Sequence, residues 1–215
     1  EVKARIAVNK TGEILGFDMV DLTGIGPYSM FPRTSAIEGN QVVNLVGGPY
    51  KHQHYRAKLN VVFQNKTPTC QYRGVGHPIA CAVTEALVDL AAQKIGMDPL
   101  RIRELNVIPD DAYPTAGISG IKLEILSHEA SLKKLRELMD YDALRAEQAA
   151  LRQQGIHRGI GFATVIELTN PSAAFYGVGG ARIASQDGAT VRLDPEGHIT
   201  VLIGVGEQGQ GTEGI

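Results

Sequence analysis

The 215-residue chain contains no tryptophan, two cysteines and few aromatic residues, which make up 6% of the sequence. Cys70 and Cys81 are too few for a disulfide framework and lack the CxxC spacing of a redox or zinc motif. A reducing compartment, the cytoplasm, is therefore expected, and a periplasmic location would require the removal of a signal peptide. No apolar run approaches the roughly 20 residues that a membrane span requires. The net charge of −2 gives no electrostatic reason to expect a nucleic-acid partner.

The composition is that of an ordinary globular protein, with 43% hydrophobic and 20% charged residues. The length allows one large domain or two small ones. Glu1 already belongs to an alternating run, and Ile215 follows a glycine-rich turn. Because natural domains seldom begin inside a strand and stop inside a loop, we interpret the chain as an internal fragment of a larger polypeptide.

The N-terminal part has the pattern of strands and loops. Alternating residues 2–8 and 13–20, joined by a turn signal at residues 9–12, predict a β-hairpin. The following residues up to Pro49 are rich in glycine and proline, which predicts a loop. A second alternating stretch, residues 55–63, predicts another strand.

The clearest helix covers residues 78–95. It opens with Pro78, ends at Gly96 and repeats apolar residues at helical spacing. Two more helices are predicted for residues 98–106 and 126–154, the second with a break near Asp140. Strands are predicted for residues 160–168, 180–185, 190–193 and 199–203. The predicted fold class is α+β, with mixed or antiparallel sheets and packed helices.

The first of two glycine-rich loops, residues 71–77, precedes the long helix and is called loop 1. It contains Arg73, Gly74, Val75 and Gly76. Glycines let the backbone approach a ligand closely, and a helix N-terminus directs N–H groups and the positive end of its dipole at the same place. The guanidinium of Arg73 adds fixed donors. Loop 1 therefore predicts a cradle for an anion or an oxo ligand, with a simple helix-entry turn as the alternative.

The second glycine-rich loop, residues 204–213, follows the predicted strand 199–203 and is called loop 2. Gly204, Gly206 and Gly209 spell the GxGxxG of a dinucleotide-binding turn, so a Rossmann protein that binds NAD or FAD is an alternative. That motif requires a βαβ unit with parallel strands. The hairpin turns before loop 2 indicate antiparallel pairing instead, which speaks against this alternative.

Further motifs are spread over almost the whole chain. They are Tyr72-Arg73-Gly74-x-Gly76-x-Pro78, Glu85-Ala86-Leu87-Val88-Asp89, Gly96-Met97-Asp98-Pro99-Leu100-x-x-Arg103-x-x-Asn106, Asp140-Tyr141 before Leu144-Arg145-Ala146-Glu147, Arg158-Gly159-Ile160-Gly161, and Gln208-Gly209-Gln210-Gly211-Thr212. In this order the chain resembles the large subunits of the molybdenum hydroxylases, the superfamily of xanthine dehydrogenase, aldehyde oxidase and aerobic CO dehydrogenase. Two dispersed loops in the family's order are far more specific than either loop alone.

The resemblance implies the cofactors and partners of a catalytic subunit. In this family, molybdenum held by molybdopterin or its cytosine dinucleotide form hydroxylates an aldehyde or N-heterocycle with oxygen from water. Electrons then pass to iron–sulfur clusters and FAD on partner domains or subunits. Residues 1–155 would be part of a first molybdopterin-binding subdomain and residues 156–215 the start of a second. The fragment alone would be inactive.

The resemblance also assigns residues to the cofactor. The expected cofactor-binding residues are Arg73, Gly74, Val75 and Gly76 of loop 1 and Gln208, Gly209, Gln210 and Gly211 of loop 2. No side chain of the chain is expected to coordinate the metal. The catalytic base, a glutamate in this family, would lie in a later segment outside the chain.

Two positions of loop 1 differ from branches of the family. The CO-oxidising branch has a cysteine where this chain has Gly74, so copper-linked CO chemistry is not expected. The xanthine and aldehyde branch has an aromatic residue, which stacks on the substrate, where this chain has Val75. Val75 cannot stack, which puts a purine in doubt and leaves an aldehyde or a smaller or differently held heterocycle. A homologue without a cofactor is a further alternative, against which the presence of Arg73 and Gln210 speaks.

Overall fold

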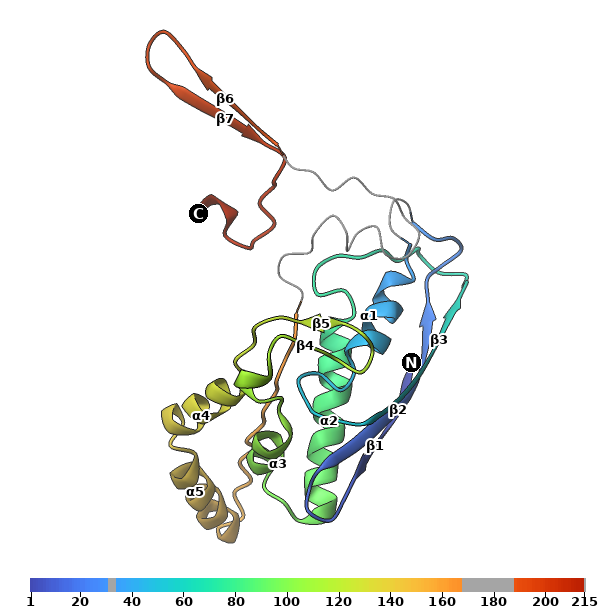
Figure 1. Ribbon diagram of the computed structural model, residues 1–215, viewed down its shortest axis with the longest axis vertical. Coiled ribbons are helices and arrows are strands. Elements are labelled where there is room, and N and C mark those ends of the chain that lie inside the picture. The colour runs from blue at the N-terminus through green and yellow to red at the C-terminus, as the bar shows by residue number, and fades with distance from the viewer. Residues whose placement is uncertain (31–33, 168–187, 215) are drawn as a thin grey trace. The chain divides into compact units, whose positions relative to one another are not determined.

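The computed structural model describes residues 1–30, 34–167 and 188–214, and the chain divides into two units, Glu1–Glu167 and Leu168–Ile215. The fold class is α+β, as predicted (Figure 1). The predicted strand 180–185 lies outside the described residues, and the division of the chain after residue 155 stays a prediction. No helix in the described ranges is long and apolar enough to cross a membrane.

A three-stranded sheet in the order β1–β2–β3 forms one layer of the first unit. β1 (Val2–Val8) and β2 (Ile14–Gly24) are the predicted antiparallel hairpin, in which Ala4 lies opposite Met19. β3 (His54–Val62) pairs with the other edge of β2 in parallel orientation. The sheet is therefore mixed.

A helix that the sequence analysis did not predict makes the parallel pairing possible. α1 (Ile37–Leu45) connects β2 to β3, and parallel neighbours require such a crossover. Its sequence contains Gly39 and two asparagines, which are poor helix formers. Gly39 is nevertheless suited to the packing, because a Cβ at this position would lie 2.5 Å from Cδ1 of Leu59. The predicted loop is therefore wrong for these residues.

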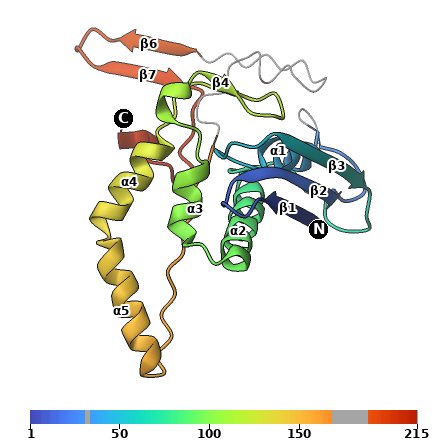
Figure 2. The ribbon, with the colours of Figure 1, turned by 60° about the horizontal axis from the view of Figure 1, so that its bottom comes forward.

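The long helix α2 (His77–Ile95) packs beside α1 on the sheet, and Figure 2 shows both helices on the same side of the strands. It ends at Gly96, whose φ of 69° is left-handed, as the sequence predicted. The next helix, α3 (Pro99–Asn106), is also confirmed. Asp98 caps it by accepting hydrogen bonds from the first N–H groups of the helix. The core between the helices and the sheet includes Phe17, Met19, Val42, Val88, Leu100 and Ile102.

The remaining helices of the first unit are α4 (His128–Leu138) and α5 (Tyr141–Gln153), with the predicted break at Asp140. Between α3 and α4 lie the short helix η1 (Asp110–Ala112) and the small antiparallel pair of β4 (Thr115–Ala116) and β5 (Lys122–Leu123).

The predicted strand 160–168 is wrong for its described part, residues 160–167. Phe162 and Thr164 are buried and their neighbours exposed, which is the alternation of a strand, but these residues belong to no strand of the described structure. Their backbone carbonyls accept hydrogen bonds from helical side chains instead, namely Arg103 and Cys81. In the second unit, β6 (Ala189–Leu193) and β7 (Ile199–Ile203) form the predicted antiparallel hairpin.

Candidate functional site

Loop 1 has a backbone conformation that few residue types tolerate. Arg73, Gly74 and Gly76 have φ angles of 38°, 69° and 80°, all in the left-handed region. Such a conformation costs a non-glycine residue about 1–3 kcal/mol, so the surrounding structure holds Arg73 against strain. The N–H of Val75 donates to the carbonyl of Arg73 (2.8 Å) and the N–H of His77 to that of Gly74 (2.7 Å). These turns fold loop 1 onto the first turn of α2.

Gly76 lies directly on the unpredicted helix α1. A Cβ at this position would be 2.4 Å from the carbonyl oxygen of Glu38 and 2.9 Å from Cβ of Gln41. Only glycine therefore allows this approach without displacing the helix backbone. The sequence predicts Gly76 as a cofactor-binding residue and gives no sign of this packing role, because α1 has no clear helical pattern.

His77 fixes the inner side of loop 1. Its side chain is buried, and Nδ1 lies 2.5 Å from the carbonyl oxygen of Gly74 and 3.1 Å from that of Val75. Both carbonyls are acceptors, so Nδ1 carries the hydrogen. His77 thus ties the loop carbonyls to the start of α2.

The chemistry of loop 1 suits an anionic, oxygen-rich group. Arg73 is exposed, with its guanidinium carbon 5.5 Å from the centre of the Tyr72 ring. The N-terminus of a helix of 19 residues adds the positive end of its dipole. Val75 is half-buried and offers an aliphatic contact but no aromatic face.

Loop 2 follows β7 and holds an anion supplied by its own chain. Gly209 and Gly211 have left-handed φ angles of 90° and 84°. Their N–H groups both donate to one carboxylate oxygen of Glu207, with a distance of 3.2 Å for Gly211. Successive N–H groups that converge on an oxygen form an anion-binding concavity. Nothing in the sequence pattern indicates this role of Glu207.

The two predicted glutamines of loop 2 also contact each other. Oε1 of Gln210 accepts from the backbone N–H of Gln208 (2.6 Å), and Nε2 donates to the carbonyl of Gly206 (3.1 Å) and the hydroxyl of Thr212 (2.6 Å). The structure thus brings together the predicted residues within each loop. It describes loop 1 in the first unit and loop 2 in the second.

The structure contradicts the Rossmann alternative. β7, the strand before loop 2, pairs in antiparallel orientation with β6, whereas the dinucleotide motif requires a parallel βαβ unit. A short 3-10 helix, η2 (Thr212–Gly214), follows the loop.

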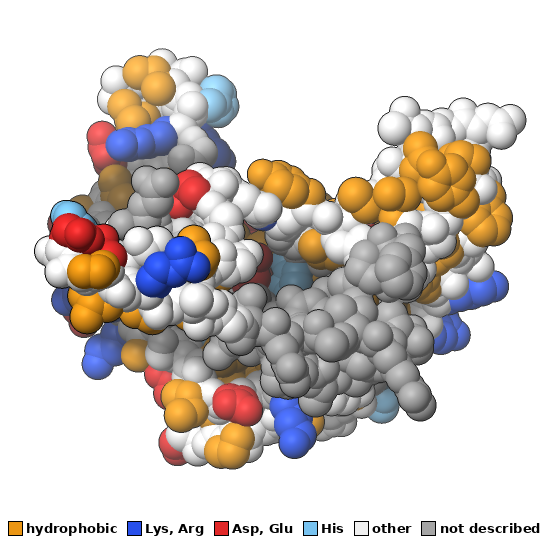
Figure 3. All heavy atoms as spheres, turned by 90° about the horizontal axis from the view of Figure 1, so that it is seen from above, with side chains coloured by type: hydrophobic (Ala, Val, Ile, Leu, Met, Phe, Trp, Pro, Cys, Tyr) orange, Lys and Arg blue, Asp and Glu red, His pale blue; other side chains and the backbone are white. Residues whose placement is uncertain are grey.

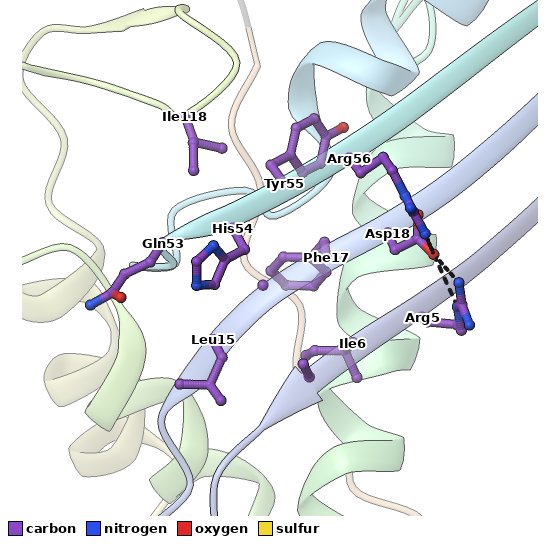
Figure 4. A pocket seen from close by; sticks show the side chains of 12 residues that line it. Arg5, Ile6, Leu15, Phe17, Asp18, Gln53, His54, Tyr55, Arg56 and Ile118 are labelled. Carbon is purple, nitrogen blue, oxygen red and sulfur yellow. Dashed lines mark hydrogen bonds and ion pairs between the residues drawn. The ribbon is translucent and has the colours of Figure 1, made fainter.

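A separate hollow of about 690 Å³ lies on the outer face of the sheet (Figure 4). Asp18 binds the guanidinium groups of Arg5 and Arg56 at its edge, and these hydrogen bonds hold the pKa of Asp18 well below its usual range. The hollow contains no residue of loop 1. It is therefore distinct from the candidate site.

Cys81 does not have the surroundings of a reactive thiol, and the described residues contain no cluster of metal ligands. Burial and the charge of Glu85 raise the pKa of the Cys81 thiol, which donates to the carbonyl of Thr164. A thiol so held is a poor nucleophile. Among the described residues, no group of three or more His, Cys, Asp or Glu side chains is arranged to hold a metal ion.

Family models described as molybdopterin cofactor-binding domains match residues 1–107 and residues 134–215. The large subunit of nicotine 6-hydroxylase from Paenarthrobacter nicotinovorans is 30% identical over 98% of this chain. The large chain of carbon monoxide dehydrogenase from Hydrogenophaga pseudoflava is 28% identical over 96% of it. The chain covers 26% of each of these relatives, so it spans about a quarter of their length.

A solved structure gives the same result in three dimensions. Quinoline 2-oxidoreductase from Pseudomonas putida 86 matches 96% of this chain with a TM-score of 0.85 and 29% identity, and the match covers 26% of that protein's chain. The two family models together cover most of the chain, and the predicted loop motifs occur in the matched segments. The chain belongs to the molybdopterin cofactor-binding domain family of the molybdenum hydroxylases.

Proposed function

We propose that the chain is part of the catalytic subunit of a molybdenum hydroxylase that oxidises an N-heterocycle or an aldehyde with oxygen from water. Each of the two loops contributes to molybdopterin binding in this proposal. The observation that carries it is the left-handed backbone of loop 1 at the start of α2, together with the N–H groups of loop 2 that converge on a carboxylate. Both loops lie in a chain that matches molybdopterin-binding models over residues 1–107 and 134–215. The names of two relatives, a nicotine hydroxylase and a quinoline oxidoreductase, favour an N-heterocycle.

The residues fit the cofactor. Molybdopterin, bound as its mononucleotide or cytosine dinucleotide form, would supply the redox chemistry. Arg73 and the backbone of Gly74 and Gly76 offer donors to its anionic oxygens at the start of α2. In loop 2, the N–H groups of Gly209 and Gly211 already bind a carboxylate oxygen, which shows that this backbone accepts an anion. Gln208 and Gln210 offer amides for the polar pterin.

Iron–sulfur and FAD partners belong to the same proposal. Several large apolar side chains are exposed in the first unit, among them Ile125 (88%), Leu138 (73%) and Phe63 (70%). Figure 3 shows hydrophobic side chains open on the surface between charged ones. Exposed apolar area of this kind suits contact with further protein surface. Such surface would come from the rest of the subunit and from the electron-transfer partners.

The Arg73→Gln substitution in the full-length subunit is expected to weaken molybdopterin binding roughly tenfold to 150-fold. The reason is the loss of a hydrogen bond to a charged group, about 1.5–3 kcal/mol. The rate of molybdenum and pterin release on dialysis measures the effect. Arg101→Gln on α3, with 61% of the arginine side chain exposed, is the matched control. Equal retention of the cofactor in both variants would contradict the role of Arg73.

The intact enzyme is expected to reduce an artificial electron acceptor with a quinoline-type heterocycle or an aldehyde and not with CO. Gly74 offers no thiolate for a second metal, and the family resemblance places the cysteine of the CO-oxidising branch at this position. The measurement is the steady-state rate of acceptor reduction with each of the three substrates. Rapid reduction that depends on CO would show the substrate assignment to be wrong.

A further inference from the structure

A buried polar cluster joins four separate segments of the first unit. It consists of Tyr50, Glu85, Arg103 and Thr164, which come from the loop after α1, from α2, from α3 and from residues 160–167. The hydroxyl groups of Tyr50 (2.8 Å) and Thr164 (2.5 Å) both donate to Oε1 of Glu85, and they lie 2.9 Å from each other. The other oxygen, Oε2, accepts a hydrogen bond from Nε of Arg103 at 2.8 Å and forms an ion pair with Nη2, also at 2.8 Å.

Arg103 makes its own contacts to the same segment. The side chain is fully buried, and Nη2 donates to the carbonyl oxygen of Phe162 at 3.2 Å. Its guanidinium carbon also lies 5.8 Å from the centre of the Phe162 ring. The cluster therefore holds residues 162–164 through a side-chain hydroxyl, a backbone carbonyl and an aromatic ring.

This arrangement is not explained by stability alone. Buried ion pairs are often no more stabilising than apolar residues of similar volume. Here the ion pair between Glu85 and Arg103 also holds residues 162–164 in place. This matters because the segment belongs to no strand in the described ranges. Without sheet hydrogen bonds, side-chain contacts set the position of this segment. They are those of Phe162 and Thr164 and a hydrogen bond from Nε2 of His128 to the carbonyl of Val165.

The held segment runs past the end of loop 1. His77, the residue that ties the carbonyls of loop 1, lines one small cavity together with Cys81, Thr164 and Ile166. The thiol of Cys81 donates to the carbonyl of Thr164 at 3.6 Å. Beyond residue 167 the chain continues to the second unit, which contains loop 2.

We propose that Glu85 and Arg103 are positioning residues for the cofactor-binding loop 1: they hold residues 162–164 against α2 beside this loop. This inference rests on the proposed function, since it treats loop 1 as a molybdopterin-binding loop.

The test compares two buried threonines in the full-length subunit. Thr164→Val removes the hydroxyl that binds Glu85. Thr84→Val removes another buried hydroxyl, whose hydrogen bonds in the structure go to Gly47 and Ala80 and not to residues 160–167. Thr164→Ser keeps the hydroxyl. The measurements are amide hydrogen exchange of residues 160–167, with and without cofactor, and the rate of pterin release.

Thr164→Val is expected to speed exchange of residues 160–167 about tenfold, by opening the anchored segment, and to speed pterin release. Thr84→Val is expected to lower the melting temperature without either effect, and Thr164→Ser to behave as the wild type. Unchanged exchange in Thr164→Val, or equal acceleration in Thr84→Val, would overturn the inference. A wild-type subunit that contains no molybdopterin would refute the proposed function, while the exchange comparison without cofactor would still decide whether Thr164 anchors the segment.

Discussion

Replacement of Arg103 by methionine is expected to lower the free energy of unfolding of the first unit by about 3–5 kcal/mol. The Arg103 side chain is fully buried, and Glu85, its main partner, is 7% exposed at the side chain. Methionine fills much of the volume but leaves the carboxylate of Glu85 buried without its cation. It also removes the side-chain hydrogen bonds to the carbonyl oxygens of Pro99 and Phe162. Urea denaturation of the 215-residue chain, followed by circular dichroism, measures the loss.

Two variants separate the buried charge from other effects of the substitution. Arg101 lies on the same helix, and 61% of its side chain is exposed. The Arg101→Met substitution is therefore expected to change the free energy of unfolding by no more than about 0.5 kcal/mol. The double variant Glu85→Leu with Arg103→Met is expected to recover part of the stability, because no unpaired charge remains buried. Asp89, the other ion-pair partner of Arg103, is 48% exposed at the side chain. If the double variant were less stable than the single variant Arg103→Met, the buried-charge explanation would be wrong.

The ionisation of the cluster agrees with this expectation. Burial alone would lower the pKa of Arg103, but the charges of Glu85 and Asp89 raise it above the usual value. Burial, followed by the charge of Glu85, raises the pKa of Tyr50. Arg103 is therefore a cation and Tyr50 a neutral donor throughout the physiological range.

The Gly76→Ala substitution is expected to cost more than about 3 kcal/mol and to release the cofactor from the full-length subunit. The added Cβ would be 2.4 Å from the carbonyl oxygen of Glu38 in α1. The φ of 80° adds the strain of a left-handed non-glycine residue, about 1–3 kcal/mol. Relief of the overlap would move loop 1 away from α1. Denaturation midpoint and molybdenum content measure the two consequences.

Gly96→Ala is the matched control at the other end of the same helix. Its φ is 69°, and a Cβ there would meet no atom within 4 Å. Only the backbone strain is expected, about 1–2 kcal/mol, with the cofactor retained. If Gly76→Ala and Gly96→Ala lowered the stability and the molybdenum content equally, the contact between Gly76 and α1 would not explain the effects of Gly76→Ala.

The sequence predicted those elements whose signals are local. The β1–β2 hairpin has a turn signal between alternating runs, and α2 has Pro78 near its start and Gly96 at its end. α1 could not be predicted in this way, because Gly39 and the asparagines favour a loop and packing against β3 outweighs them. Residues 160–167 alternate between buried and exposed side chains as in a strand. The buried ones, however, contact polar side chains of α2 and α3 and no neighbouring strand.

The candidate site was predicted as residue types and not as a supported geometry. The order of Arg73 and the glycines of loop 1 indicated an anion cradle at a helix N-terminus, where the structure has left-handed turns. The contact of Gly76 with α1 and the bond from His77 to Gly74 depend on tertiary packing. In loop 2, the carboxylate of Glu207 on two glycine N–H groups requires coordinates to be seen.

The different surroundings of the two thiols have a practical consequence for spectroscopy. Cys70 is exposed and immediately precedes loop 1, whereas Cys81 is partly buried with its thiol bonded to the carbonyl of Thr164. Burial also raises the pKa of Cys81, which keeps it protonated and slow to alkylate. A maleimide fluorophore or spin label should therefore attach to Cys70 in the wild-type chain without any cysteine replacement. The label would report on loop 1 from three residues before Arg73.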